Sequence, residues 1–268
     1  MDKRPIGIFD SGVGGLTVCK SIRDILPSEN IIYFGDTLRF PYGTRSHDTI
    51  ISYSREISQY LNTRDVKLIV VACNTSSAVA LETLRNENTI PIIGVIDAGA
   101  RAACRRLKGN TIGVIATRAT VRSLSYVKAI SKISPEIETI QQDASIFVSL
   151  TEEGWIDDDV TRLSAKKYLQ NMYNSGIRTL ILGCTHFPLL KKAINDVYPD
   201  LDLVDTGIEV AVEVQRILKE KKLENTGNMG DTILYASDIT DVLQRLKEMF
   251  FEENSSTISR LIINGQQR

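Results

Sequence analysis

The chain has 268 residues, of which 43% are hydrophobic and 24% are charged, with 32 Lys and Arg residues against 33 Asp and Glu residues. This length allows one large domain or two of ordinary size, and the composition is that of a globular protein rather than a disordered or fibrous one. The formal net charge of −1 excludes a polybasic nucleic-acid-binding protein, and no apolar run approaches the length of a membrane span.

Short apolar runs alternate with longer helix-like stretches from residue 5 onward. Continuous apolar strands separated by helices predict parallel sheets that are covered on both faces. Because ligands bind beyond the carboxyl ends of such strands, the residues that follow each strand become the candidates for a site. The predicted strands comprise residues 6–9, 31–34, 67–71, 91–95, 111–115 and 179–182, and helices are predicted over residues 12–26 and 46–62.

The two halves of the chain carry a faint internal repeat. Three short matches occur in the same order and with similar offsets, which predicts two similar α/β units of about 100 residues each. The repeat favours a pseudo-twofold arrangement with a cleft between the units. Residues 6–11 align with 112–117, residues 70–75 with 181–186, and residues 95–99 with 203–207, at offsets of 106, 111 and 108.

Residues 208–268 lie outside this repeat. They contain a predicted helix that ends at residues 219–222, a strand near residues 233–235 and a second helix that runs to about Phe251. Since the stretch has too few strands to form a domain alone, we expect it to pack on the first unit, with a frayed polar tail from Glu252. The expected first domain therefore comprises residues 1–97 plus 208–268, and the expected second domain comprises residues 98–207.

Four widely separated cysteines do not form a disulfide scaffold, and the N-terminus lacks the apolar region of a signal peptide. We therefore expect a cytoplasmic protein with reduced thiols. Cys73 and Cys184 each follow an apolar strand and precede residues suited to begin a helix, whose dipole would lower the pKa of a thiol. One such cysteine is most simply a small buried hydrophobe, but two at equivalent points of a repeat favour a pair of reactive thiols. Cys19 and Cys104 are interpreted as packing residues.

His186, two residues after Cys184, is a candidate proton partner for the thiol or for a substrate. The alternative is a histidine that only satisfies a helix start. The second histidine, His47, is expected to be a solvated residue at the beginning of a helix. With two histidines and no CxxC or HxxxH spacing, we expect no metal site.

A glycine-rich segment, residues 10–17, follows the first strand and is suited to bring a ligand against backbone amides. It lacks the ending of a P-loop and matches the dinucleotide fingerprint only weakly, through Gly12, Gly14 and Asp36. The Asp10 carboxylate is suited to receive an ammonium group, although helix capping is the simpler role for Asp10 and Ser11. A substrate with an ammonium and a carboxylate group between two thiols suggests cofactor-independent proton transfer on opposite faces of one carbon.

Over nearly its whole length the chain resembles the bacterial glutamate racemases of the Asp/Glu racemase superfamily. The resemblance implies two α/β domains with the active site between them, assembled as a homodimer. It further implies cofactor-independent interconversion of L- and D-glutamate, which supplies D-glutamate for peptidoglycan and so for cell wall and cell shape. The motifs that carry it are residues 8–17 (IFDSGVGGLT), 33–36 (YFGD), 41–43 (PYG), 71–75 (VACNT), 94–96 (GVI), 99–101 (GAR) and 182–190 (LGCTHFPLL).

The resemblance also implies roles for individual residues. Cys73 would exchange the α-proton of the D-enantiomer and Cys184 that of the L-enantiomer, with Asp10 and His186 assisting the respective thiols and Glu152 contributing. The chain departs from the family pattern at residues 97–99, 117–120 and 142–149. Because the sequence starts nine residues before Asp10, we expect no activation by a cell-wall precursor. The implied substrate contacts are Asp10, Ser11, Tyr42, Gly43, Asn74, Thr75, Thr117, Thr120, Thr185 and His186.

Three other functions remain open from the residues. An aspartate racemase would use the same paired cysteines, which set the chemistry but not the length of the substrate side chain. A dinucleotide-dependent oxidoreductase would use Gly12, Gly14 and Asp36 as a cofactor site. A non-catalytic binding protein with two lobes would hold an amino acid while both cysteines only pack.

Overall fold

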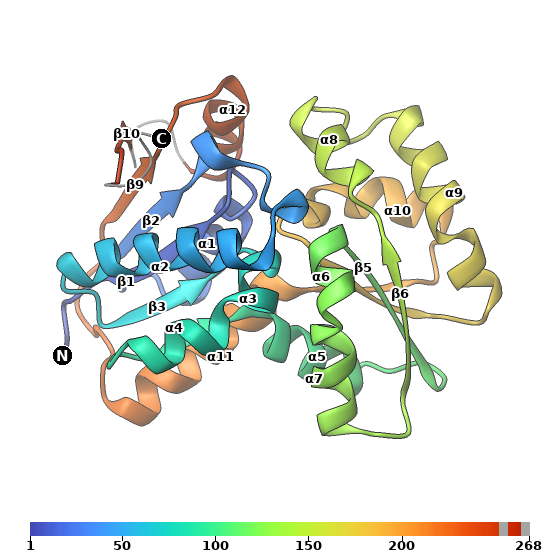
Figure 1. Ribbon diagram of the computed structural model, residues 1–268, viewed down its shortest axis with the longest axis horizontal. Coiled ribbons are helices and arrows are strands. Elements are labelled where there is room, and N and C mark those ends of the chain that lie inside the picture. The colour runs from blue at the N-terminus through green and yellow to red at the C-terminus, as the bar shows by residue number, and fades with distance from the viewer. Residues whose placement is uncertain (252–256, 264–268) are drawn as a thin grey trace.

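The computed structural model describes residues 1–251 and 257–263, and within these ranges the chain forms two parallel β-sheets flanked by helices. Figure 1 shows two α/β bodies side by side, each built around one sheet, which we term the first and second domains. The predicted fold class is confirmed. The strand order is β10-β9-β2-β1-β3-β4 in the first sheet and β6-β5-β7-β8 in the second.

All paired strands in the described ranges run parallel, so their carboxyl ends lie along one edge of each sheet. This is the edge at which α/β proteins place their ligands. The first sheet contains β1 (Ile6–Asp10), β2 (Ile31–Gly35), β3 (Leu68–Val71), β4 (Ile92–Gly94), β9 (Thr232–Ala236) and β10 (Ile258–Arg260). The second contains β5 (Thr111–Ala116), β6 (Glu138–Asp143), β7 (Thr179–Gly183) and β8 (Asp202–Asp205).

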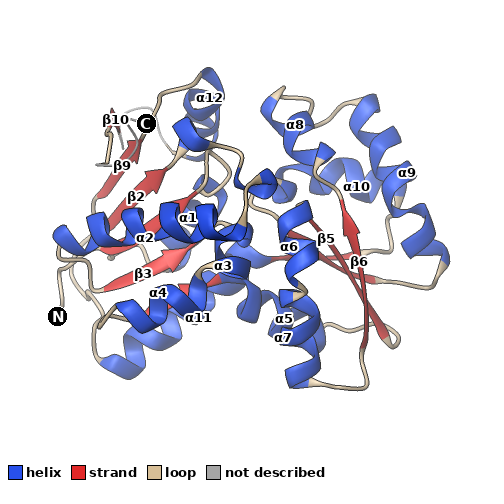
Figure 2. Ribbon diagram, in the orientation of Figure 1, coloured by secondary structure: helices blue, strands red, loops and turns tan. Residues whose placement is uncertain are grey.

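Helices connect the strands and cover both faces of each sheet (Figure 2). In the first domain these are α1 (Leu16–Ile25), α2 (His47–Thr63), α3 (Asn74–Val79), α4 (Leu81–Glu87), α11 (Thr206–Lys221) and α12 (Asp241–Phe250). In the second they are α5 (Val95–Arg105), α6 (Arg118–Ser123), α7 (Ser125–Ile133), α8 (Ile146–Glu152), α9 (Asp159–Asn174) and α10 (Lys191–Val197). Short 3₁₀ turns are η1 (Thr37–Arg39), η2 (Tyr42–Thr44) and η3 (Phe187–Leu190).

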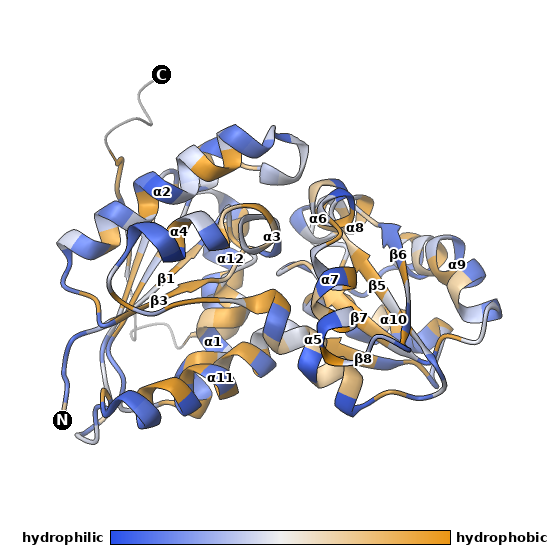
Figure 3. Ribbon diagram, turned by 60° about the horizontal axis from the view of Figure 1, so that its bottom comes forward, coloured by the Kyte–Doolittle hydropathy of each residue, from blue (hydrophilic) through white to orange (hydrophobic). Residues whose placement is uncertain are grey.

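Alternate residues of each central strand enter different cores. Ile8 and Val70 pack with α1, α11 and α12 on one face of the first sheet, whereas Phe9 and Val71 pack with α2 and α4 on the other. Because side chains alternate along a strand, burial on both faces requires an apolar residue at every position, which is what the sequence shows. Figure 3 shows the apolar strands inside and hydrophilic colour on the outward faces of the helices.

Three strands differ from the sequence-based prediction. β8 overlaps one of the repeat matches but is not among the predicted strands. β6 was not predicted because its residues, ETIQQD, are polar and at most half-buried at the edge of the second sheet. β10 lies in the tail that was expected to fray, and it pairs with β9. The parts of that tail at residues 252–256 and 264–268 lie outside the described residues. As expected, the C-terminal segment packs on the first domain, since β9 pairs with β2.

The internal repeat appears in the strand order, since β2-β1-β3-β4 corresponds to β6-β5-β7-β8. The predicted match of residues 95–99 with 203–207 is out of register. The helix after β4 begins at Val95 and the helix after β8 begins at Thr206, an offset of 111 residues. This equals the offset between Cys73 and Cys184, so β3-β4 and β7-β8 repeat with one spacing.

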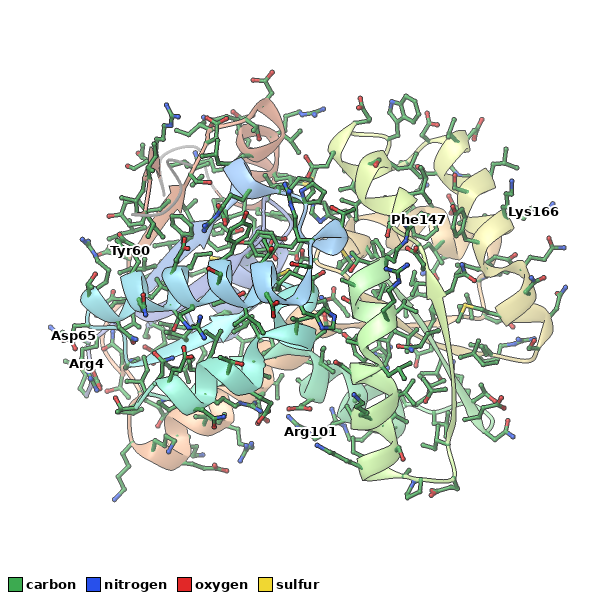
Figure 4. All side chains as sticks on the ribbon, in the orientation of Figure 1. Arg4, Tyr60, Asp65, Arg101, Phe147 and Lys166 are labelled. Carbon is green, nitrogen blue, oxygen red and sulfur yellow. The ribbon has the colours of Figure 1, made fainter. Side chains whose placement is uncertain are left out.

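The chain passes between the domains at the beginnings of α5 and α11, which pack against each other. Gly99 permits this contact, because a Cβ atom there would lie 2.7 Å from the Thr206 side chain. Arg101 of α5, labelled in Figure 4, pairs with Glu213 of α11 at 3.2 Å. The division into residues 1–97 plus 208–268 and residues 98–207 remains a proposal. No helix in the described ranges is long and apolar enough to cross a membrane.

Candidate active site between two sheets

A cavity of about 370 Å³ lies between the two domains at the carboxyl ends of their strands. Both candidate thiols line it, so the structure brings together Cys73 and Cys184 from strands of different sheets. The lining residues are Ser11, Phe40, Pro41, Tyr42, Gly43, Thr44, Cys73, Asn74, Thr75, Thr117, Ser145, Val148, Ser149, Glu152, Glu153, Cys184, Thr185 and His186.

Cys73 follows β3 and caps the N-terminus of α3. Its sulfur accepts a hydrogen bond from the Ser76 amide at 3.4 Å and lies 3.4 Å from the Ser11 hydroxyl. The expectation of a net lowering of the pKa of this thiol is wrong. Burial, together with the negative charge of Asp10, raises the pKa of Cys73 to about 11 and outweighs those hydrogen bonds. Cys73 is therefore a neutral thiol, and a proton donor, at neutral pH.

Cys184 follows β7 in the second sheet, but its setting differs from that of Cys73. The residues after it form a turn and the 3₁₀ segment η3, and α10 begins only at Lys191, so Cys184 does not lie at the N-terminus of an α-helix. This corrects the predicted helix start. Its charged neighbour is His186, whose Nδ1 atom lies 3.8 Å from the sulfur.

His186 is buried and links Cys184 to Glu152, because its Nε2 atom lies 2.7 Å from Glu152 Oε1. Burial alone would lower the pKa of the imidazole, but the hydrogen bonds with Cys184 and Glu152 outweigh it and raise the pKa to about 10. The ring is therefore an imidazolium at neutral pH. Phe40 of the first domain packs against it with 5.7 Å between ring centroids.

Asp10, at the end of β1, is fully buried and stands behind the cavity wall rather than on it. Its carboxylate accepts hydrogen bonds from the Gly12 amide at 3.0 Å and from the Thr185 hydroxyl at 3.3 Å. Burial raises the pKa of Asp10, while the His186 charge and the amides of Gly12 and Gly15 oppose the rise. Asp10 thus affects Cys73 through its charge and joins the first domain to Thr185 of the second.

Polar side chains of both domains meet on one side of the cavity. The hydroxyl of Thr75 lies 2.9 Å from that of Thr117, which lies 3.1 Å from that of Thr120. Thr120 is fully buried and outside the lining, so it supports Thr117. Asn74 accepts a hydrogen bond from Tyr126 at 2.6 Å, and among the described residues its buried amide nitrogen has no partner. That nitrogen is a donor suited to an anionic ligand group.

Hydrogen bonds to Asp36 fix the segment that contains Tyr42 and Gly43. The Tyr42 hydroxyl donates to the Asp36 carboxylate, which also accepts hydrogen bonds from Arg39 at 2.7 Å and Ser237 at 3.2 Å. The phenol is thus occupied within the protein. Asp36 is fully buried in this network, which argues against the role of a ribose-binding carboxylate in a dinucleotide site.

Gly14 has a different role from the one expected of a ligand-binding glycine loop. A Cβ atom there would collide with the Thr185 hydroxyl and lie 2.6 Å from the His186 ring. The lack of a side chain at Gly14 therefore allows the second domain to approach the first, and the hydroxyl of Thr17 donates to the Thr185 carbonyl at 3.1 Å beside it.

Sequence reasoning missed part of the cavity lining. Phe40, Pro41 and Thr44 lie in the segment between β2 and α2, where only Tyr42 and Gly43 were expected as contacts. The spacing of Ser145, Val148, Ser149 and Glu152 places them on one face of α8 and could have been found from Glu152. The described residues include no group of three or more His, Cys, Asp or Glu side chains that could hold a metal ion.

Known proteins are similar to this chain in sequence and in fold. The family described as Asp/Glu/Hydantoin racemase matches residues 6–214. A glutamate racemase from Geobacter metallireducens is 48% identical over 241 residues, 89% of each chain. The crystal structure of Francisella tularensis glutamate racemase in complex with D-glutamate has a TM-score of 0.91 and 39% identity, covering 98% of this chain and 99% of that one. The Escherichia coli glutamate racemase in complex with L-glutamate and the activator UDP-MurNAc-ala has a TM-score of 0.80 and 30% identity, covering 98% and 100%.

Proposed function

Because this chain belongs to the Asp/Glu/Hydantoin racemase family, we propose that it interconverts L- and D-glutamate by cofactor-independent proton transfer between Cys73 and Cys184. It is an isomerase, a racemase that acts on glutamate. The relatives named above, two of them bound to opposite enantiomers of glutamate, support this substrate. The observation that carries the mechanism is that two thiols from different sheets line one cavity.

The two thiols supply the base and the acid that inversion of a carbon centre requires. One thiolate removes the α-proton from one face of the substrate, and the opposing thiol returns a proton to the other face. The protonated ring of His186 can donate to the Cys184 sulfur, an interaction that is strongest when the sulfur carries a negative charge. For L-glutamate, Cys184 acts as the base and Cys73 as the acid, and these roles reverse for D-glutamate.

The charged groups of glutamate match the polar lining of the cavity. The unpartnered amide of Asn74 and the hydroxyls of Thr75 and Thr117 are donors for a carboxylate. Ser11, Tyr42, Gly43, Thr185 and His186 complete the proposed contacts, whereas Asp10 and Thr120 act from behind the wall. We also infer, from the family resemblance, that the enzyme works in the cytoplasm as a homodimer and supplies D-glutamate for peptidoglycan.

The direct test is incubation of the purified protein with L- or D-glutamate in deuterated water without added cofactor. We expect optical rotation to decay to zero and deuterium to enter the α-carbon. A parallel incubation with L-aspartate tests the nearest alternative, an aspartate racemase. Faster exchange of aspartate than of glutamate would overturn the assignment of glutamate as the substrate. Glutamate binding without exchange would instead indicate a binding protein.

The cysteine variants test the mechanism in the same assay. Replacing Cys73→Ala or Cys184→Ala removes one base and should lower turnover in both directions by at least about 100-fold. Circular dichroism should show an unchanged fold. Cys104→Ala is the matched control, because this half-buried thiol on α5 lies outside the cavity, and it should retain activity. Normal racemisation by either active-site variant would exclude the two-thiol mechanism.

A further inference from the structure

A contact between the domains lies beside Glu152, outside the groups assigned above. Arg245, an exposed residue of α12 in the first domain, donates a hydrogen bond from Nη2 to the Glu152 carbonyl of the second domain at 3.2 Å. Figure 1 shows α12 and α8 facing each other at the top of the two domains. Because Glu152 and Glu153 line the cavity, this contact lies at its rim.

The carbonyl that Arg245 contacts belongs to the last residue of α8. The final carbonyls of a helix have no partner within the helix, and they carry its negative dipole end. A guanidinium group there satisfies a carbonyl and meets a favourable potential. The next turn also makes room for it, since a Cβ atom at Gly154, where φ is +80°, would lie 2.7 Å from Arg245 Nη1. The guanidinium therefore covers the C-terminus of α8.

The residue whose carbonyl is held in this way also holds the catalytic imidazolium. The side chain of Glu152 lies 2.7 Å from His186, and His186 lies against the Cys184 sulfur. The main chain of Glu152 is thus fixed from the first domain, while its side chain acts within the second. Loss of the hydrogen bond from Arg245 to the Glu152 carbonyl would free the end of α8 and loosen the bond between Glu152 and His186.

The geometry points to Arg245 as a positioning residue, which caps α8 across the domain boundary and thereby holds the Glu152–His186 pair against Cys184. This inference rests on the proposed racemase function and deepens it. It makes proton transfer at Cys184 depend on contact between the two domains. Proton transfer at Cys73 does not involve Arg245, because the groups that surround that thiol, Ser11, Ser76 and Asp10, all belong to the first domain.

The test compares Arg245→Ala and Arg245→Lys with Arg216→Ala. Arg216 is an exposed arginine of α11 that pairs with Glu213 and Glu220 and lies outside the cavity. We expect Arg245→Ala to lower kcat about 10-fold, since small misplacements of a catalytic group are costly, and Arg245→Lys to restore part of it. Arg216→Ala should leave kcat unchanged. Equal activities of Arg245→Ala and Arg216→Ala would overturn the inference.

Isotope effects separate positioning from general loosening of the protein. With α-deuterated L-glutamate the transferred deuterium goes to Cys184, and with α-deuterated D-glutamate it goes to Cys73. Arg245→Ala should therefore raise the isotope effect on kcat/KM for the L-enantiomer alone. In a Glu152→Gln background the same change should cost much less, because the two residues act in series. Equal isotope effects or additive losses would show that Arg245 does not act through Glu152.

A readout independent of turnover keeps the inference separate from the proposed function. The ring proton of His186 can be followed by NMR across the pH range, since the chain has only two histidines. Arg245→Ala should lower the pKa of His186 from about 10, and Arg216→Ala should not. An unchanged titration in Arg245→Ala overturns the inference even if the protein racemises glutamate, whereas failure of the wild type to racemise overturns only the proposed function.

Discussion

Cys73 and Cys184 end equivalent strands, but their nearest charged groups have opposite signs. Cys73 faces the Asp10 carboxylate and is kept neutral, whereas Cys184 lies beside the imidazolium of His186. The repeat therefore places two thiols in the lining of one cavity, and the neighbouring charges distinguish them.

The charge on His186 should make the stability of the folded protein depend on pH. Its pKa is raised from 6.5 to about 10 in the folded protein, so the folded state binds this proton more tightly than the unfolded state. The resulting stabilisation is fully present below pH 6.5 and is lost as the pH rises to about 10. The free energy of unfolding, measured by urea denaturation at several pH values, should fall across this window.

Glu152→Gln is the matching variant, because it keeps the shape of the side chain and removes its charge. The pKa of His186, followed by NMR, should be lower in this variant, and the fall in stability should end at a lower pH. A His47→Gln background leaves a single histidine signal for the measurement. The prediction fails if the His186 titration is the same with glutamine at position 152.

At the scale of elements, the sequence predicts those strands that are buried on both faces. β1, β3, β5 and β7 are apolar apart from single polar residues at their ends, and they lie in the interior of their sheets, where periodicity and burial agree. β6 escapes prediction because an edge strand can be polar. Its place is nevertheless implied by the repeat, since β6 occupies beside β5 the position that β2 occupies beside β1. A search for the missing counterpart of β2 would have found it.

The residues of the candidate site likewise differ in whether the sequence predicts them. Residues at the end of a strand or just after it, such as Asp10, Cys73 and Cys184, are predictable because topology alone brings strand ends together. Phe40 is not, since its position depends on how the segment after β2 folds over Asp36. The sequence also does not predict the raised pKa of Cys73, because this pKa is set by burial and by Asp10, which lies far away in the sequence.

The turn between β1 and α1 leaves no room for a side chain at Gly14. Gly14→Ala should lower kcat/KM by about 100-fold, because the added methyl group would push the Thr185–His186 turn away from the first domain. The melting temperature should change little, since the clash lies between domains and not in either core. Gly227→Ala is the control, because its nearest neighbour, Asn225, would be 3.3 Å away in a remote loop. Full activity of Gly14→Ala would show that the domains need not approach this closely.

For the whole molecule, the position of the cavity follows from contacts between the domains that surround it. Asp10 bonds to Thr185, Thr75 to Thr117, and Asn74 to Tyr126, each pair joining a strand end or helix start of the first domain to the second. Since these groups are also cavity residues or their direct supports, domain approach and site assembly are one event. Stability elsewhere in the first domain should then be separable from activity.

The opposite end of the first sheet allows this separation to be tested. Lys67, just before β3, is fully buried and donates to the Glu29 carboxylate and to the carbonyls of Asp2 and Leu223, both at 2.8 Å. Glu29 in turn accepts a hydrogen bond from the Asn225 amide at 2.8 Å. One buried ion pair therefore joins the N-terminal segment, the loop before β2 and the loop after α11. Removing one partner would leave a buried charge uncompensated.

Lys67→Met should accordingly lower the free energy of unfolding by about 3–5 kcal/mol, measured by urea denaturation, because the Glu29 carboxylate loses its cation in a buried site. Adding Glu29→Gln should restore part of the loss. Arg55→Ala breaks the exposed pair of Arg55 with Glu87 and should cost less than about 1 kcal/mol. At temperatures where Lys67→Met is folded, its kcat should match that of the wild type, because the pair lies at the end of the sheet away from the cavity. Equal losses of stability in Lys67→Met and Arg55→Ala would show that the buried pair does not hold these segments together.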